Sequence, residues 1–106
     1  YKPNITITSF LAQDYHIKTG AEAGNLYIDG NLNNTGDGTA YELRLHIVAM
    51  NVEGKAIDAS IDAGGLTPHM TMGVSRQLNY NGSALVSCNV TIYYLDLVDA
   101  QNRPRP

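Results

Sequence analysis

Strict alternation of apolar and polar residues over residues 39–50 is the feature that most constrains this chain. The stretch TAYELRLHIVAM places an apolar side chain at every second position. A period of two residues is the period of a β-strand with one buried face. We therefore predict a strand whose inner face carries Tyr41, Leu43, Leu45, Ile47 and Ala49 and whose outer face carries Glu42, Arg44, His46 and Val48.

Five further stretches show a weaker form of the same alternation, and none shows a sustained helical period. They are residues 4–13, 25–33, 56–62, 70–78 and 84–97. In the first, Phe10 and Leu11 break the parity of the preceding isoleucines, which indicates a bulge. We expect strand 56–62 to be short and to lie at a sheet edge, where edge pairing would allow the chain to dimerise. The last strand is expected to turn Val86, Cys88, Val90, Ile92 and Tyr94 inward, with Cys88 as an inert core residue.

Turn signals separate these stretches, and 106 residues are enough to bury one core. We therefore predict an all-β fold, an antiparallel two-sheet immunoglobulin-like sandwich of six to seven strands, formed by residues 1–100 as a single domain. A small barrel is the alternative. The proline-rich residues 101–106 are expected to form a linker or a disordered tail.

Composition excludes several classes of partner. Seven basic against ten acidic residues give a net charge of −3, so the chain lacks the basic stripe that binds nucleic acid or anionic membranes. No apolar run reaches the roughly 18 residues of a membrane span. A single cysteine permits neither an internal disulfide nor a cysteine-based zinc site, and we expect no cofactor.

The spacing of turns and strands over residues 24–95 resembles a known group of domains. The stretches YIDGNLNNTGDGTAYELRLHIVAMNVEGKAID and GGLTPHMTMGVSRQL are similar to the small immunoglobulin-like domains repeated in archaeal and bacterial cell-surface proteins, such as the cell-adhesion-related domain found in bacteria and the FxLYD type. His69 stands where that group often has a glycine. The resemblance implies a stalk, spacer or adhesion module without enzyme activity.

An acidic, asparagine-rich stretch raises the question of a metal site. Asp29, Asn31 and, further on, Asp37 are weak candidates, because alternate oxygen-bearing residues open a calcium loop. Such a loop needs Gly at its sixth position and Glu at its twelfth, where this chain has Asn34 and Ala40. We therefore interpret the stretch as a strand face that leads into an Asn/Gly turn.

Catalytic signatures are weak. His16, His46 and His69 have no spacing that brings them together, and the chain lacks a nucleophile elbow. The glycine-rich stretch 30–38 precedes a strand and not a helix, so it does not predict a phosphate loop. We expect no enzyme activity.

Seven tyrosines make aromatic binding the second hypothesis. Tyr27 and Tyr93 have outward parity, and exposed rings on a sandwich are able to stack on sugars, as in a carbohydrate-binding module. Packing across neighbouring strands is the alternative for both rings. Besides these tyrosines, His46 with Glu42 and Arg44, and the turn 33–38, are the expected contact residues.

Four Asn-x-Ser/Thr triplets, at Asn4, Asn33, Asn81 and Asn89, favour an exported and glycosylated protein. We therefore expect a non-catalytic module of an extracellular or cell-surface protein, anchored by segments outside this chain. Its expected partners are other domains of the same protein or another protein. The sequence does not predict the oligomeric state.

Overall fold

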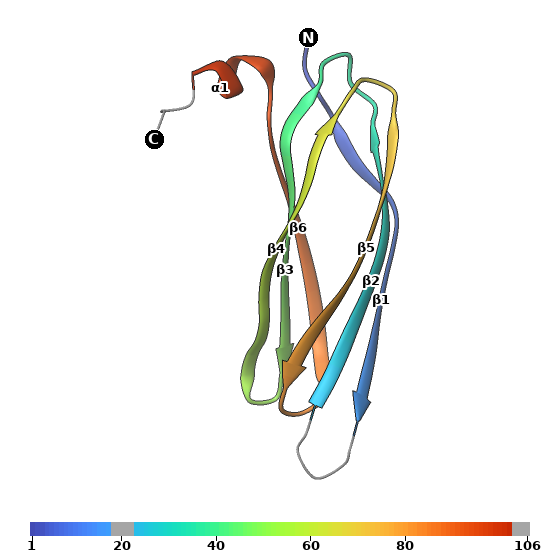
Figure 1. Ribbon diagram of the computed structural model, residues 1–106, viewed down its shortest axis with the longest axis vertical. Helices are drawn as coiled ribbons and strands as arrows, with labels where there is room; N and C mark the ends of the chain where they lie inside the picture. Colours follow the sequence, from blue (N-terminus) through green and yellow to red (C-terminus); the bar gives the residue numbers. More distant parts are fainter. Residues whose placement is uncertain (18–22, 103–106) are drawn as a thin grey trace.

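Six strands and one short helix make up the computed structural model, which describes residues 1–17 and 23–102 (Figure 1). The elements are β1 (Ile5–Ile17), β2 (Ala23–Asn34), β3 (Ala40–Asn51), β4 (Gly54–Leu66), β5 (Thr71–Asn81), β6 (Leu85–Leu95) and α1 (Leu97–Gln101). The strands form two antiparallel three-stranded sheets, ordered β1-β2-β5 and β4-β3-β6. This arrangement confirms the predicted all-β two-sheet sandwich.

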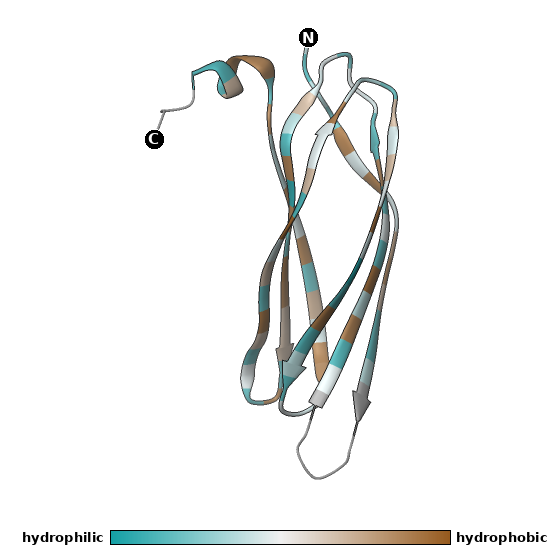
Figure 2. Cartoon of the chain, viewed as in Figure 1, coloured by the Kyte–Doolittle hydropathy of each residue, from teal (hydrophilic) through white to brown (hydrophobic). Residues whose placement is uncertain are grey.

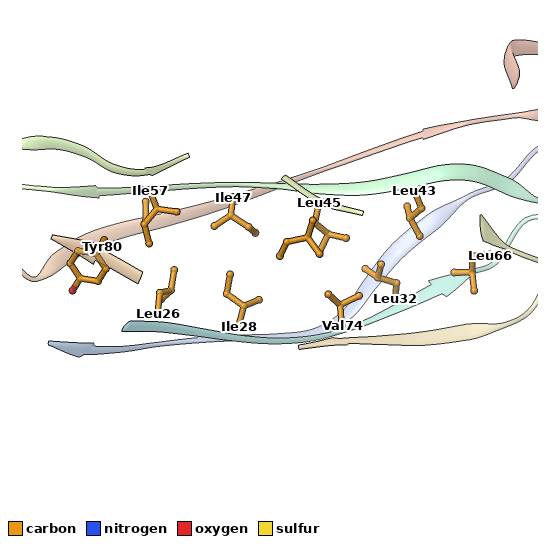
Figure 3. Close-up of a cluster of buried hydrophobic side chains, with 12 residues drawn as sticks. Leu26, Ile28, Leu32, Leu43, Leu45, Ile47, Ile57, Leu66, Val74 and Tyr80 are labelled. Carbon is orange, nitrogen blue, oxygen red and sulfur yellow. The ribbon is translucent and has the colours of Figure 1, made fainter. Parts of the chain in front are cut away.

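The core lies between the two sheets and is built by alternate residues of each strand. Leu43, Leu45, Ile47 and Ala49 of β3 are fully buried, as their parity predicts. They face Leu26, Ile28 and Leu32 of β2 across the sandwich, as Figure 3 shows for the labelled side chains. In Figure 2 the central strands show the corresponding bands of hydrophobic and hydrophilic residues. Removal of this apolar surface from water is the main driving force for folding.

Bulges account for most departures from the expected parity. In β1 the pairing register shifts between Ile7 and Ser9, so Ile5 and Phe10 both contact the core although their parities differ. In β6 the register shifts between Leu85 and Ser87. Leu85 therefore packs against the core, and Val86 is 66 % exposed. The prediction that Val86 points inward is wrong, because a bulge is set by the partner strand as well as by a strand's own pattern.

Three elements differ in extent from their prediction, the first being β1, which continues to Ile17 beyond the expected stretch 4–13. β4 spans 13 residues instead of the short stretch 56–62, although it does lie at a sheet edge. Helix α1 was not predicted; it begins after Asp96, whose carboxylate accepts a hydrogen bond from the backbone N–H of Asp99 at 2.8 Å. An acidic cap three residues before another polar residue is a recognised helix start, so the sequence did contain this signal.

The described chain enters and leaves the sandwich at the same end. Figure 1 shows the N-terminus and helix α1 at the top of the view. An ion pair of 2.5 Å between Lys2 Nζ and Asp96 Oδ2 joins them. The hydrogen bond in this pair raises the pKa of Lys2, while the pKa of Asp96 is lowered by the N–H of Asp99 and by Lys2.

At the opposite end, β1 is tied to the β5–β6 turn by Asp14. Its carboxylate accepts hydrogen bonds from the hydroxyl of the buried Tyr80 and from the N–H of Leu85. Burial, followed by the bond to Asp14, raises the pKa of Tyr80 to about 12, so the hydroxyl stays neutral and donates. A Cβ at Gly24 would overlap the Tyr80 ring, so only glycine fits there.

Asn34 closes the end at which the chain enters and leaves, and its side chain is completely buried. Its Nδ2 donates to the carbonyls of Gly38 at 2.8 Å and Leu66 at 3.0 Å. Its Oδ1 accepts from the N–H groups of Asn4 at 3.1 Å and Gly36 at 3.0 Å. One amide therefore satisfies four backbone groups from different parts of the chain.

Replacement of Asn34 by alanine is expected to destabilise the fold by about 3 kcal/mol or more, because two carbonyls and two N–H groups lose their partner. Urea unfolding followed by circular dichroism measures this change. Asn31→Ala is the control and is expected to cost about 0.5 kcal/mol or less, since that exposed side chain has a bond to the Ser9 hydroxyl at the surface. Equal costs for the two variants would contradict the role of Asn34.

Candidate binding surface on the outer face of the β4-β3-β6 sheet

A bulge in β3 shapes the outer face of the β4-β3-β6 sheet. Register shifts against both neighbouring strands fall between Ala40 and Arg44. Glu42 has a φ of +51°, in the left-handed region that non-glycine residues seldom adopt. Such bulges redirect side chains and interrupt pairing, and they often lie next to functional sites.

Beside this bulge the outer face contains two adjoining hollows. One, of about 630 Å³, is lined by residues that include Glu42, Arg44, Asp62 and Tyr93. The other, of about 190 Å³, is lined by Arg44, His46, Ser60 and Tyr93. Arg44 and Tyr93 line both, so the structure brings together four residues proposed for contacts from the sequence: Glu42, Arg44, His46 and Tyr93. We refer to this region, residues 42, 44, 46, 58, 60, 62 and 93, as the outer-face site.

On one side of the outer-face site, the carboxylate of Asp58 pairs with both His46 and Lys55. His46 Nε2 lies 2.5 Å from Asp58 Oδ1, and Lys55 Nζ lies 3.2 Å from Asp58 Oδ2. The hydrogen bond to His46, and then the one to Lys55, lower the pKa of the Asp58 carboxyl. The ring of His46 also lies against Tyr93, with 6.4 Å between ring centroids. The site therefore combines a guanidinium, an imidazole, carboxylates and an exposed aromatic ring, which suits polar, orientated contacts.

Tyr27 belongs to a different surface. It lies on the outer face of the β1-β2-β5 sheet, so the structure does not bring it together with Tyr93, which is on the outer face of the other sheet. Tyr15 of β1 packs edge to face against Tyr27, with ring centroids 5.1 Å apart. Both rings are about half exposed, and with Gln13 and Asn25 they line a shallow hollow of about 500 Å³.

The three weak metal candidates do not converge. Asp29 accepts a hydrogen bond from the Ser75 hydroxyl on β5, and Asn31 donates to the Ser9 hydroxyl on β1. Asp37 accepts from the N–H of Lys2. Within residues 1–17 and 23–102, no group of three or more His, Cys, Asp or Glu side chains is arranged to hold a metal ion.

The asparagine-rich turn is packed against the N-terminal segment. A Cβ on Gly36 or Gly38 would overlap the backbone of residues 1–4. Thr35 N–H donates to the Asn4 carbonyl at 2.8 Å, and Gly38 N–H to the Lys2 carbonyl at 3.2 Å. Most of the turn's polar groups thus serve contacts within the domain, which leaves less of it for an outside partner than expected.

The remaining candidates occupy separate positions. His69 has a φ of +64°, the conformation that favours glycine, and its N–H donates to the Asn34 carbonyl at 2.8 Å. The side chain of His16 lies outside the described residues. Cys88 is half-buried against the core, and burial raises the pKa of its thiol. Among the sequon asparagines, Asn4, Asn81 and Asn89 are exposed and Asn33 is half-buried.

Asp58, Ser60, Asp62 and Tyr15 are among the surface residues that sequence reasoning missed. Each lies on a neighbouring strand, beside or diagonal to a residue that was identified. The NVEGK turn indicates that β3 and β4 form a hairpin, but the register shift at Ala49 and Met50 sets which residues face each other, so the turn alone gave no signal for Asp58 or Ser60. Tyr15 fell in a stretch interpreted as the end of a strand and the start of a loop.

Comparison with known protein families, with curated proteins and with solved structures found no match to this chain. None of the helices in the described residues has the length and apolar character needed to cross a bilayer.

The His46–Asp58 contact leads to a prediction about protonation. In His46→Ala the pKa of Asp58 is expected to rise toward its ordinary value of 3.8, because the largest cause of its lowering is removed. A folded-state pKa below the unfolded value contributes stability above about pH 4 that is lost as the pH falls through the folded-state pKa. Carboxyl NMR titration measures the shift. Lys55→Ala should raise the pKa less, and an unchanged pKa in His46→Ala would contradict the contact.

Proposed function

We propose that this domain is a non-catalytic interaction module of an extracytoplasmic surface protein and that it contacts its partner through the outer-face site. The observation that carries the proposal is the convergence of Arg44, His46 and Tyr93 beside the β3 bulge. Arginine and tyrosine are enriched among residues that dominate protein interfaces, since each combines apolar area with orientated hydrogen bonding.

The position of the chain ends supports an interaction role over that of an in-line spacer. A spacer in a linear array passes the chain from one end of the domain to the other. Here Lys2 and Asp96 form an ion pair at one end of a molecule whose longest dimension is 53 Å. The sandwich therefore projects from its point of attachment, which presents its outer faces and its far end to a partner.

Surface location is supported by the sequons and by the resemblance to repeated cell-surface domains. Asn81 and Asn89 are both exposed at the surface of the sandwich, where a glycan has room. The left-handed backbone at His69 matches the position where those domains often have glycine. An extracytoplasmic protein with non-enzymatic contacts accounts for both features.

The location is tested by protease treatment of intact cells of the source organism, followed by mass spectrometry of the released peptides. We expect peptides of this domain in the released fraction, with glycan mass on Asn81 or Asn89. Recovery only from the cytosol, without modification, would contradict the proposal.

The contact surface is tested by the binding of the fluorescently labelled domain to the same cells. Tyr93→Ala and Arg44→Ala are each expected to weaken binding about tenfold, the effect of removing a well-placed interface side chain. Tyr27→Ala is the matched control, because Tyr27 is similarly exposed on the opposite outer face. Equal losses for Tyr27→Ala and Tyr93→Ala would refute the outer-face site.

A carbohydrate-binding module is the second candidate function, and the Tyr15–Tyr27 pair is the observation that favours it. Two exposed rings flanked by the amides of Gln13 and Asn25 provide a stacking surface and hydrogen-bonding groups, as sugars require. Tyr93 lies on the other face and does not contribute to this surface.

If the domain binds sugars here, Tyr15→Ala or Tyr27→Ala should weaken the affinity for a soluble oligosaccharide about 2- to 10-fold, the worth of one aromatic contact. Chemical-shift titration of the backbone amides with a panel of oligosaccharides measures this affinity. Tyr93→Ala serves as the control and should leave it unchanged. An absence of shifts around Gln13 and Asn25 with every oligosaccharide would remove this candidate.

A further inference from the structure

The open edge of β6 differs from the other three sheet edges. The exposed edge of β4 carries Lys55, Asp58 and Asp62, β5 carries Arg76, and β1 carries Asp14 and a bulge. Charges and bulges of this kind prevent edge strands from pairing with another chain. β6 also has a bulge, between Leu85 and Ser87 near its start, but its 11 residues, LVSCNVTIYYL, contain no charged residue and no proline. Valine, isoleucine, threonine and tyrosine in this strand all favour pairing.

The flank formed by β6 and β1 is also incompletely covered. The inward residues of β3 are fully buried, but those of β6 are only half-buried against the core: Cys88, Val90, Ile92 and Tyr94. On β1, which contacts β6 across the sandwich, Ile5 and Phe10 are half-buried as well. The flank formed by β4 and β5 instead presents mainly small alanines, with Met72 and Leu78. The larger, partly exposed apolar surface therefore lies along β6 and β1.

We propose that this flank is a symmetric interface, at which β6 pairs antiparallel with β6 of a second copy of this chain. This interface adjoins the outer-face site, since Tyr93 belongs to β6, but it buries the open edge and the flank of the sandwich and does not depend on surface location. The fourth strand, whose edge was the candidate for pairing from the sequence, carries three charges and is not the interface we propose.

The residues of β6 complement themselves about a two-fold axis at Val90. In that register Cys88 lies opposite Ile92 of the second copy, and Val90 lies opposite its counterpart, so apolar residues meet on the inner face. On the outer face Asn89 meets Thr91, and Ser87 meets Tyr93. No like charges oppose each other, and apolar and Thr pairs of this kind stabilise neighbouring strands. The same patch on both copies is what a two-fold interface requires.

The two-fold axis runs perpendicular to the continuous sheet that the two paired β6 strands create. Both β1 strands therefore lie on the same side of that sheet, and the open flank of each copy covers the open flank of the other. An 11-residue strand is about 36 Å long at 3.3 Å per residue. The two sheets lie roughly 10 Å apart, so the flank, with the outer side chains included, is about 20 Å wide. Length times width for both copies gives a buried area on the order of 1,400 Å² in total. Specific interfaces bury about 1,200–2,000 Å², so a second copy suffices to cover the flank.

The proposal is tested by sedimentation equilibrium of the unglycosylated 106-residue chain from about 1 μM upward, where interfaces of this size associate. We expect the mass to rise with concentration to twice the 11.5 kDa of the chain. A mass that stays at 11.5 kDa up to about 1 mM overturns the proposal and leaves the edge for a strand of a different protein.

Two double variants at the exposed positions 89 and 91 test the register. Asn89→Lys with Thr91→Lys places lysine opposite lysine twice, and the dissociation constant is expected to rise at least about tenfold. Asn89→Asp with Thr91→Lys places aspartate opposite lysine at the same positions and is expected to keep the wild-type dissociation constant or lower it. Circular dichroism confirms that both fold, as expected for exposed sites. A dimer with equal dissociation constants in the two variants overturns β6 pairing.

Discussion

The buried amide of Asn34 is the interaction on which the sandwich depends most. At this end of the sandwich three segments converge: the chain entering β1, the turn after β2 and the end of β4. The backbone groups of these segments are withdrawn from water. Each of them would destabilise the folded state if it were left without a hydrogen-bond partner. Asparagine is suited to this position because it presents two donors and an acceptor with two lone pairs. These four hydrogen bonds explain why asparagine occupies position 34 of the asparagine-rich turn.

Much of the fold could be predicted from the sequence because burial between two sheets imposes a period of two. The inner row of β3 follows that rule without exception from Leu43 to Ala49. The parity break at Phe10 indicated the bulge in β1, but the bulges in β3 and β6 could not be predicted, because they depend on two strands at once. Near the β3–β4 turn, direct pairing would set Ile47 opposite Asp58; a one-residue shift at Ala49 and Met50 sets it opposite Ala59 instead. The apolar pattern thus selects the register, but only when both strands are considered together.

The outer-face site shows the same limit. Alternation was enough to place Arg44, His46 and Tyr93 on outward parities, since each lies between neighbours that face the core. It was not enough to show that His46 lies beside Asp58 or that Tyr15 accompanies Tyr27, because those contacts join different strands. The left-handed backbone of Glu42 has no local sequence signal at all, since glutamate is an unfavourable residue for that conformation. The hollow beside it follows from the register of β3 against both neighbours.

The ion pair between Lys2 and Asp96 has a mechanical consequence. Force applied through the chain on either side of the sandwich acts at one end of β1 and of β6, close to the first hydrogen bonds that each makes with its neighbour. Hydrogen bonds between strands run perpendicular to the strands, so such a force breaks them one after another, beginning at that end of the sandwich. A sandwich with its ends at opposite poles would resist by shearing many bonds together. Under such a load the domain is expected to open at a lower force than a sandwich pulled from opposite poles, because few hydrogen bonds bear the force at one time.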